Sequence, residues 1–96
     1  MISNFTRHAE VRAKQRGIPY EIADLLIQYG DKQHDGHVGV VRFFSAISVL
    51  EMQDDIGKST VKKISEYLRT YLVEASRDGA VITVGKLHPK RHIWKH

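Results

Sequence analysis

The sequence contains no cysteine and no long apolar run, and each absence excludes a class of protein. Without cysteine the chain can form no disulfide, no thiolate nucleophile and no cysteine-based zinc or iron–sulfur site. No apolar stretch is long enough to span a bilayer, and polar residues interrupt the opening "MISNFTRHAEV" before a signal-peptide core can form. We therefore expect a cytoplasmic protein with no membrane partner.

The rest of the composition is that of a folded chain. Hydrophobic residues make up 42% and charged residues 27%, which is too apolar for a disordered protein. A chain of 96 residues is large enough for one modest core and too small for two. We therefore interpret residues 1–96 as a single domain.

Positive charge is concentrated at the two ends of the chain. The net charge is +4, to which residues 1–17 contribute +3, residues 86–96 contribute +4 and the segment between them −3. A fold that brings the ends together creates one electropositive surface, which suits phosphate-bearing partners because binding releases counterions from nucleic acid. The alternative is that basic ends only keep a small protein soluble, and charge alone does not separate the two interpretations.

Capping residues predict two helices near the N-terminus. Thr6 is a suitable N-cap and Gly17 a suitable end for the first helix, while Pro19 stands where a second helix begins and Gly30 where it closes. The second helix carries apolar residues with the spacing of a core-facing stripe: Ile22, Leu25, Leu26 and Tyr29.

Two Asp–Gly pairs predict hairpins. Asp35-Gly36 lies between strand-like flanks in "KQHDGHVGVVRFF", and Asp78-Gly79 does so in "YLVEASRDGAVITVGKL". Between the hairpins, "SAISVLEMQ" is ambiguous: it alternates weakly and is also compatible with the approach to a helix, and we interpret it as a strand or extended segment. The stretch "GKSTVKKISEYLRTYL" predicts a helix around residues 59–70, capped by Ser59 or Thr60. Its apolar side is formed by Val61, Ile64, Leu68 and Leu72.

The predicted order of elements is therefore α-α-β-β-α-β-β. This order is typical of an α+β fold, with an N-terminal helix pair and one further helix packed on a mainly antiparallel sheet of four strands or slightly more.

The first predicted helix carries a basic stripe. His8, Arg12 and Arg16 are four residues apart, so each step advances only about 40° around the helix. The small residues Ala9 and Ala13 form a second stripe beside it, where an ordinary surface helix has leucine or isoleucine. We expect close packing along the alanines, with the basic stripe at the rim of that contact.

The C-terminal segment "KLHPKRHIWKH" gathers residues suited to nucleic acid. Lysine and arginine bind phosphate, histidine moves protons near neutral pH, and Trp94 can stack on a base. Trp94 can equally anchor a terminal strand on the sheet. His88 and His92 have the spacing of a metal-chelating pair, but Pro89 disfavours a regular helix and no carboxylate is nearby. We therefore predict no metal and no cofactor, and we interpret His34 and His37 as solvated turn residues.

Two motifs resemble a bacterial family. The opening "RHAEVRAKQRGI" and the later "DGAVITVGKLHPKR" are similar to domain of unknown function 4258, whose members carry an "HA-x-x-R-x-x-x-RGI" opening and a "G-x-(V)-I-T-V" strand. The likeness covers roughly residues 5–30 and 70–92, and the helix around 59–70 looks like an addition to the minimal pattern. That family is similar to the barnase/EndoU/colicin/RelE-like group, which includes small metal-independent ribonuclease toxins with helices packed on a four-stranded antiparallel sheet.

The resemblance implies that His8, Arg12 and Arg16 line an active cleft beside the terminal strands. Metal-independent cleavage of RNA by attack of the 2′-hydroxyl needs a base, an acid and cations around the developing charge. His8 is then the first candidate for one proton transfer, and His88 or His92 for the other. The predicted cationic and phosphate-contacting residues are Arg12, Arg16, Lys86, Arg91 and Thr83, with Trp94 as a further RNA contact.

A non-catalytic module is the alternative interpretation. The same basic ends can bind RNA, DNA or an acidic protein such as an antitoxin-like partner, with the histidines taking no part in chemistry. A domain with no nucleic-acid role at all is the third. The sequence leaves these alternatives open, together with the oligomeric state.

Overall fold

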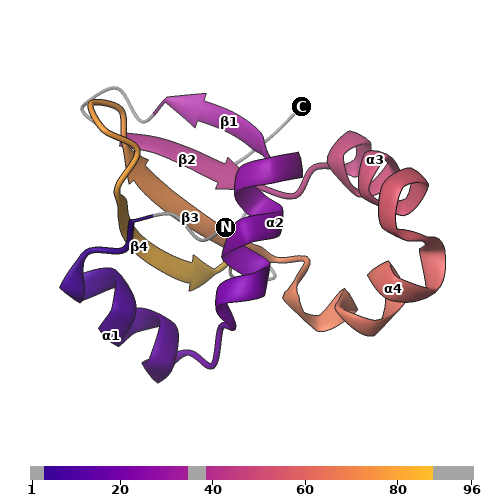
Figure 1. Ribbon diagram of the computed structural model, residues 1–96, viewed down its shortest axis with the longest axis horizontal. Coiled ribbons are helices and arrows are strands. Elements are labelled where there is room, and N and C mark those ends of the chain that lie inside the picture. Colours follow the sequence, from indigo (N-terminus) through magenta and orange to yellow (C-terminus); the bar gives the residue numbers. More distant parts are fainter. Residues whose placement is uncertain (1–3, 35–38, 88–96) are drawn as a thin grey trace.

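The first two helices begin and end close to the predicted residues. The computed structural model describes residues 4–34 and 39–87 (Figure 1). Helix α1 spans Arg7–Gln15, and the Thr6 side chain caps it by accepting a hydrogen bond from the Ala9 backbone N–H at 3.2 Å. Gly17 follows with φ of 62°, which glycine adopts at little cost. Helix α2 spans Tyr20–Tyr29 and begins directly after Pro19, so both predicted helices are confirmed.

Both predicted hairpins are present. Strands β1 (Asp31–His34), β2 (Gly39–Phe43), β3 (Thr70–Ala75) and β4 (Val81–Lys86) form an antiparallel sheet in the order β1-β2-β3-β4. Gly79 stands in the β3–β4 turn with φ of 74°. The Asp35-Gly36 pair lies outside the described residues, although β1 and β2 pair on either side of it. The α+β fold with helices packed on a four-stranded antiparallel sheet is therefore confirmed.

The segment between the hairpins differs from the prediction. "SAISVLEMQ" is helical, not extended: α3 spans Ala46–Ile56, and the Ser45 side chain accepts from the Ser48 backbone N–H at 3.1 Å. This cap and the complete burial of Met52 outweigh the weak alternation that suggested a strand. In Figure 1, α3 lies at the right, beyond the end of α2.

The single helix predicted around residues 59–70 is also wrong. Helix α4 spans only Lys58–Lys63 and is followed by the 3₁₀ helix η1 (Ser65–Tyr67). Gly57, with φ of 94° and no side chain to donate or accept, stands at the N-cap instead of Ser59 or Thr60. Leu72, expected on this helix, is in β3, where it is fully buried. The described residues therefore hold two α-helices between the hairpins in place of one.

The main core lies between the N-terminal helices and one face of the sheet. Its buried members come from α1, α2, the loop between them and the strands β3 and β4: Ala9, Ala13, Ile18, Ile22, Ala23, Leu26, Leu72, Val81 and Val84. The two alanines of α1 are nearly inaccessible, so the helix backbone approaches the sheet closely, as the small-residue stripe predicts. Large aliphatic residues of α2 fill the rest of the space.

The N-terminal segment covers the outer edge of β4. The Val81 N–H donates to the Asn4 carbonyl at 2.7 Å, and the Thr6 N–H donates to the Val81 carbonyl at 3.0 Å. The Thr6 hydroxyl adds a bond of 3.3 Å to the Ile82 carbonyl. These bonds satisfy backbone groups that an exposed edge strand leaves open. They also place the start of α1 directly beside the last strand.

Candidate functional site

The basic stripe of α1 begins with a pair of side chains in contact. The Nε–H of Arg12 donates to Nε2 of His8 at 3.4 Å, as residues four apart on a helix can. His8 is exposed and Arg12 half-buried. In this bond Nε2 is the acceptor. The pair therefore places an imidazole ring beside a fixed positive charge.

Arg16 has a different environment from the other two members of the stripe. Its Nη1 donates to the Val84 carbonyl at 2.7 Å, across the outer edge of β4. This bond uses one of the five N–H groups of the guanidinium. Arg16 is exposed as a residue. The stripe thus divides into an outward His8–Arg12 pair and an arginine held on the sheet edge.

Gly85 creates the space that Arg16 occupies. A Cβ at residue 85 would lie 2.6 Å from Nη1 of Arg16 and 2.9 Å from the hydroxyl of Tyr71. Tyr71 and Gly85 are directly opposite each other in the β3–β4 register. Any larger residue would therefore displace the guanidinium or the phenol. Tyr71 is absent from the predicted site, and the glycine within a strand was the signal that a close approach occurs there.

Two further predicted residues lie on the same strand. Thr83 is half-buried and pairs with Val73, on the sheet face opposite to Val84. Lys86 is exposed at the end of β4, and its Nζ lies 5.8 Å from the centre of the Tyr67 ring, within cation–π range. The structure therefore places Arg16, Thr83 and Lys86 along one edge strand, with His8 and Arg12 on the helix beside it.

The other predicted site residues belong to the C-terminal segment. His88, Arg91, His92 and Trp94 lie outside the described residues. That these residues form one electropositive surface with α1 stays a prediction. Their roles in proton transfer and RNA contact also stay predictions.

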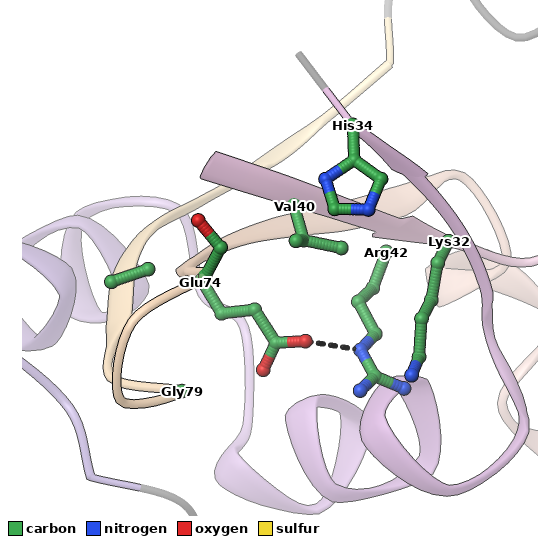
Figure 2. A pocket seen from close by; sticks show the side chains of 8 residues that line it. Lys32, His34, Val40, Arg42, Glu74 and Gly79 are labelled. Carbon is green, nitrogen blue, oxygen red and sulfur yellow. Dashed lines mark hydrogen bonds and ion pairs between the residues drawn. The ribbon is translucent and has the colours of Figure 1, made fainter. Parts of the chain in front are cut away.

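A second group of charged side chains lies across β1, β2 and β3 and was missed by the sequence analysis. It lines a cavity of ≈ 300 Å³ and includes Lys32, His34, Arg42 and Glu74 (Figure 2). Nε of Arg42 lies 2.6 Å from Oε1 of Glu74, and the two side chains are only 13% and 11% exposed. Nη1 of Arg42 also donates to the Ile27 carbonyl in the last turn of α2, at 2.7 Å. His34, expected in a turn, is instead the last residue of β1.

An acidic cavity of ≈ 320 Å³ lies between α2 and α3. Its walls include Tyr29, Glu51, Asp54 and Asp55. The Tyr29 hydroxyl donates to the Asp55 carboxylate at 3.0 Å. Burial and this neighbouring carboxylate raise the pKa of Tyr29 from its ordinary 10.0. Among the described residues, no three histidine, cysteine, aspartate or glutamate side chains gather as ligands for a metal ion.

The structure defines a small α+β protein whose antiparallel sheet is covered by helices. Charged side chains gather beside β4 and in the cavity across β1, β2 and β3. No family model, no curated protein and no solved structure matches the chain. Within residues 4–34 and 39–87, none of the helices has the length and apolar character needed to cross a bilayer. The geometry and charge of the described residues are therefore the basis for a function.

Proposed function

We propose that this chain is a small RelE-like toxin that cleaves RNA without a metal ion, through attack of the 2′-hydroxyl on the adjacent phosphorus. The observation that carries the proposal is the exposed His8–Arg12 pair, with an Nε–Nε2 distance of 3.4 Å, on a helix rich in basic residues. The resemblance of "HAEVRAKQRGI" and "VITV" to a family near the ribonuclease toxins supports the same reaction.

His8 is suited to the role of general base. The hydrogen bond from Arg12 uses the single lone pair of Nε2, so the Arg12 N–H must move off this nitrogen before it takes a proton. In the proposed step this nitrogen takes the 2′-hydroxyl proton while the 2′-oxygen forms a bond to phosphorus. The bond from phosphorus to the 5′-oxygen breaks, and that oxygen takes a proton from an acid, for which His88 and His92 are the candidates. The products are a 2′,3′-cyclic phosphate and a free 5′-hydroxyl. DNA has no 2′-hydroxyl, so it is not cut.

Cations beside the base stabilise the negative charge that develops on the phosphorane oxygens. Arg12 touches His8 and is therefore next to any phosphate whose neighbouring 2′-hydroxyl reaches Nε2. Arg16 is fixed on the β4 edge by its bond to Val84, which limits the rearrangement needed when RNA binds. Lys86 adds an exposed cation at the end of β4, and Arg91 is a further proposed cationic contact. Thr83 and Trp94 are further proposed RNA contacts.

The test is a cleavage assay on mixed cellular RNA in EDTA, with RNA affinity measured in parallel. His8→Ala should lower cleavage by at least roughly a hundredfold, since a positioned proton-transfer group contributes about 10²–10⁴-fold. Its RNA affinity should change little. Arg12→Gln should lose both cleavage and some affinity, whereas Lys14→Gln removes the same charge from an exposed position on α1 outside the stripe and should cut normally. Equal loss of binding and cleavage in His8→Ala would refute the assignment of His8 as the base.

A second candidate function is favoured by α3. Ile47 and Leu50 are 66% and 61% exposed, three residues apart on one side of that helix. Exposed aliphatic residues of this size are typical of protein interaction surfaces when they are contiguous. A non-catalytic module that binds an antitoxin-like protein through these residues would give no cleavage products in the same assay, whereas one that binds nucleic acid through its basic residues would also show salt-dependent binding.

A further inference from the structure

Two positively charged side chains face each other across β1 and β2. Lys32 is directly opposite Arg42 in the antiparallel register. Residues in this relation have Cβ atoms about 4.5–5.5 Å apart on the same face, and like charges there destabilise the sheet. Both side chains line the ≈ 300 Å³ cavity described above. The arrangement therefore concentrates positive charge at one place on the sheet.

Only part of this charge is neutralised by the protein. Glu74 pairs with Arg42 through Nε, at 2.6 Å. The Lys32 side chain makes no hydrogen bond or ion pair within the described ranges, and the residue is exposed. Arg42 uses Nε for Glu74 and one Nη1 hydrogen for the Ile27 carbonyl, so further guanidinium donors stay available. The cavity wall thus carries an excess of positive charge and of hydrogen-bond donors.

His34 adds a titratable ring to the same cavity. It is two residues after Lys32 on β1, so both side chains stand on one face of the sheet. Figure 2 shows the His34 ring at one end of the cavity, and Lys32 and Arg42 extending together toward the other end. Glu74 reaches in from β3, with its dashed contact to Arg42. An acceptor-rich anion placed here would meet cationic donors from two strands.

We propose that this cavity binds a phosphate group. The Lys32 ammonium and the free donors of the Arg42 guanidinium contact the phosphate oxygens, and His34, at the other end of the cavity, lies beside the rest of the ligand. The two side chains suit different parts of a phosphate group. The guanidinium presents a rigid planar set of donors, and the ammonium presents a compact charge. The cavity volume of ≈ 300 Å³ is at the lower end of sites for small ligands, so it accommodates a phosphate with part of a nucleoside. This site is separate from the His8–Arg12 pair and does not depend on RNA cleavage.

The experiment is an amide NMR titration of the full chain at constant ionic strength, with Lys32→Gln compared with Lys63→Gln. Lys63 is exposed on α4, so its substitution removes the same charge outside the cavity. Inorganic phosphate should produce saturable shifts at the amides of residues 32–34, 40–42 and 74–76. Lys32→Gln should bind roughly tenfold more weakly, because a charge-assisted contact is lost. Lys63→Gln should bind like the unmodified chain.

Two further ligands identify the source of the phosphate. A nucleoside 5′-monophosphate that binds better than a dinucleoside monophosphate indicates a terminal phosphate, whereas equal binding indicates the backbone of a nucleic acid. The proposal is overturned if phosphate produces no saturable shifts, if Lys32→Gln binds as well as the unmodified chain, or if Lys63→Gln is weakened equally. His8→Ala keeps its phosphate binding here, so loss of RNA cleavage in that variant and loss of phosphate binding in Lys32→Gln are separate results.

Discussion

The buried ion pair of Arg42 and Glu74 offers the most direct test of how the sheet and α2 are held together. Replacing Arg42 with methionine keeps most of the aliphatic length but leaves the Glu74 carboxylate without its ion-pair partner, at a site where its side chain is only 11% exposed. The Ile27 carbonyl, near the end of α2, also loses its donor at 2.7 Å. Removing one partner of a buried ion pair costs about 3–5 kcal/mol.

That cost is large for a domain of this size. Small domains unfold with a free energy of about 5–15 kcal/mol, so Arg42→Met removes a substantial fraction of the stability. At about 4–8 °C per kcal/mol, the midpoint of thermal unfolding should fall by at least about 12 °C. Urea unfolding followed by far-UV circular dichroism measures the free energy directly.

Two control variants separate the loss of the ion pair from the loss of an arginine as such. Arg69→Met makes the same chemical change at an exposed position and should alter the free energy of unfolding by no more than about 0.5 kcal/mol. Arg42→Met combined with Glu74→Leu removes the uncompensated carboxylate and should recover most of the loss. A cost below about 1 kcal/mol for Arg42→Met, or a double variant less stable than the single one, would refute the reasoning.

Two further changes test other close contacts. In Gly30→Ala the new Cβ would lie 2.5 Å from the Leu26 carbonyl oxygen, a backbone atom that cannot rotate away. The free energy of unfolding, measured in urea, should therefore fall by about 1–3 kcal/mol. An unchanged midpoint would contradict this contact. The pKa of Tyr29 is raised from 10.0 by burial and by Asp55, so the unfolded chain loses this proton first and stability falls as the pH rises above 10. Tyr29→Phe should lack this component in unfolding measurements from pH 8 to 11, and a difference between the two proteins that does not change with pH would exclude it.

Local signals predicted much of the fold because they act between near neighbours in sequence. Thr6, Gly17 and Pro19 mark helix ends through single side-chain or backbone preferences, and the structure has the helix ends there. The β3–β4 hairpin follows from a turn sequence between β-branched runs. For residues 46–56 the weak alternation predicted a strand, but Ser45 caps a helix there, and a serine before an apolar stretch is a local helix-start signal.

The length of α4 could not be obtained from spacing alone. Val61, Ile64 and Leu68 have helical periodicity, and Leu72 continues it into what is in fact β3. Pairing of Leu72 with Arg42 on one side and Val84 on the other decides the strand. A periodic pattern cannot reveal this competition, because the partners are distant in sequence.

The sequence by itself determined the His8–Arg12 pair, since residues four apart meet wherever a helix forms, and it also determined the alanine stripe that lets α1 approach the sheet. The tertiary structure alone decided that Arg16 lies on the edge of β4 over Gly85. It also decided that Lys32, Arg42 and Glu74 share one cavity. These residues come from three strands, and their meeting depends on the register of β1, β2 and β3. Register is set by long-range pairing of whole strands on a packed face, which no local pattern of residues contains.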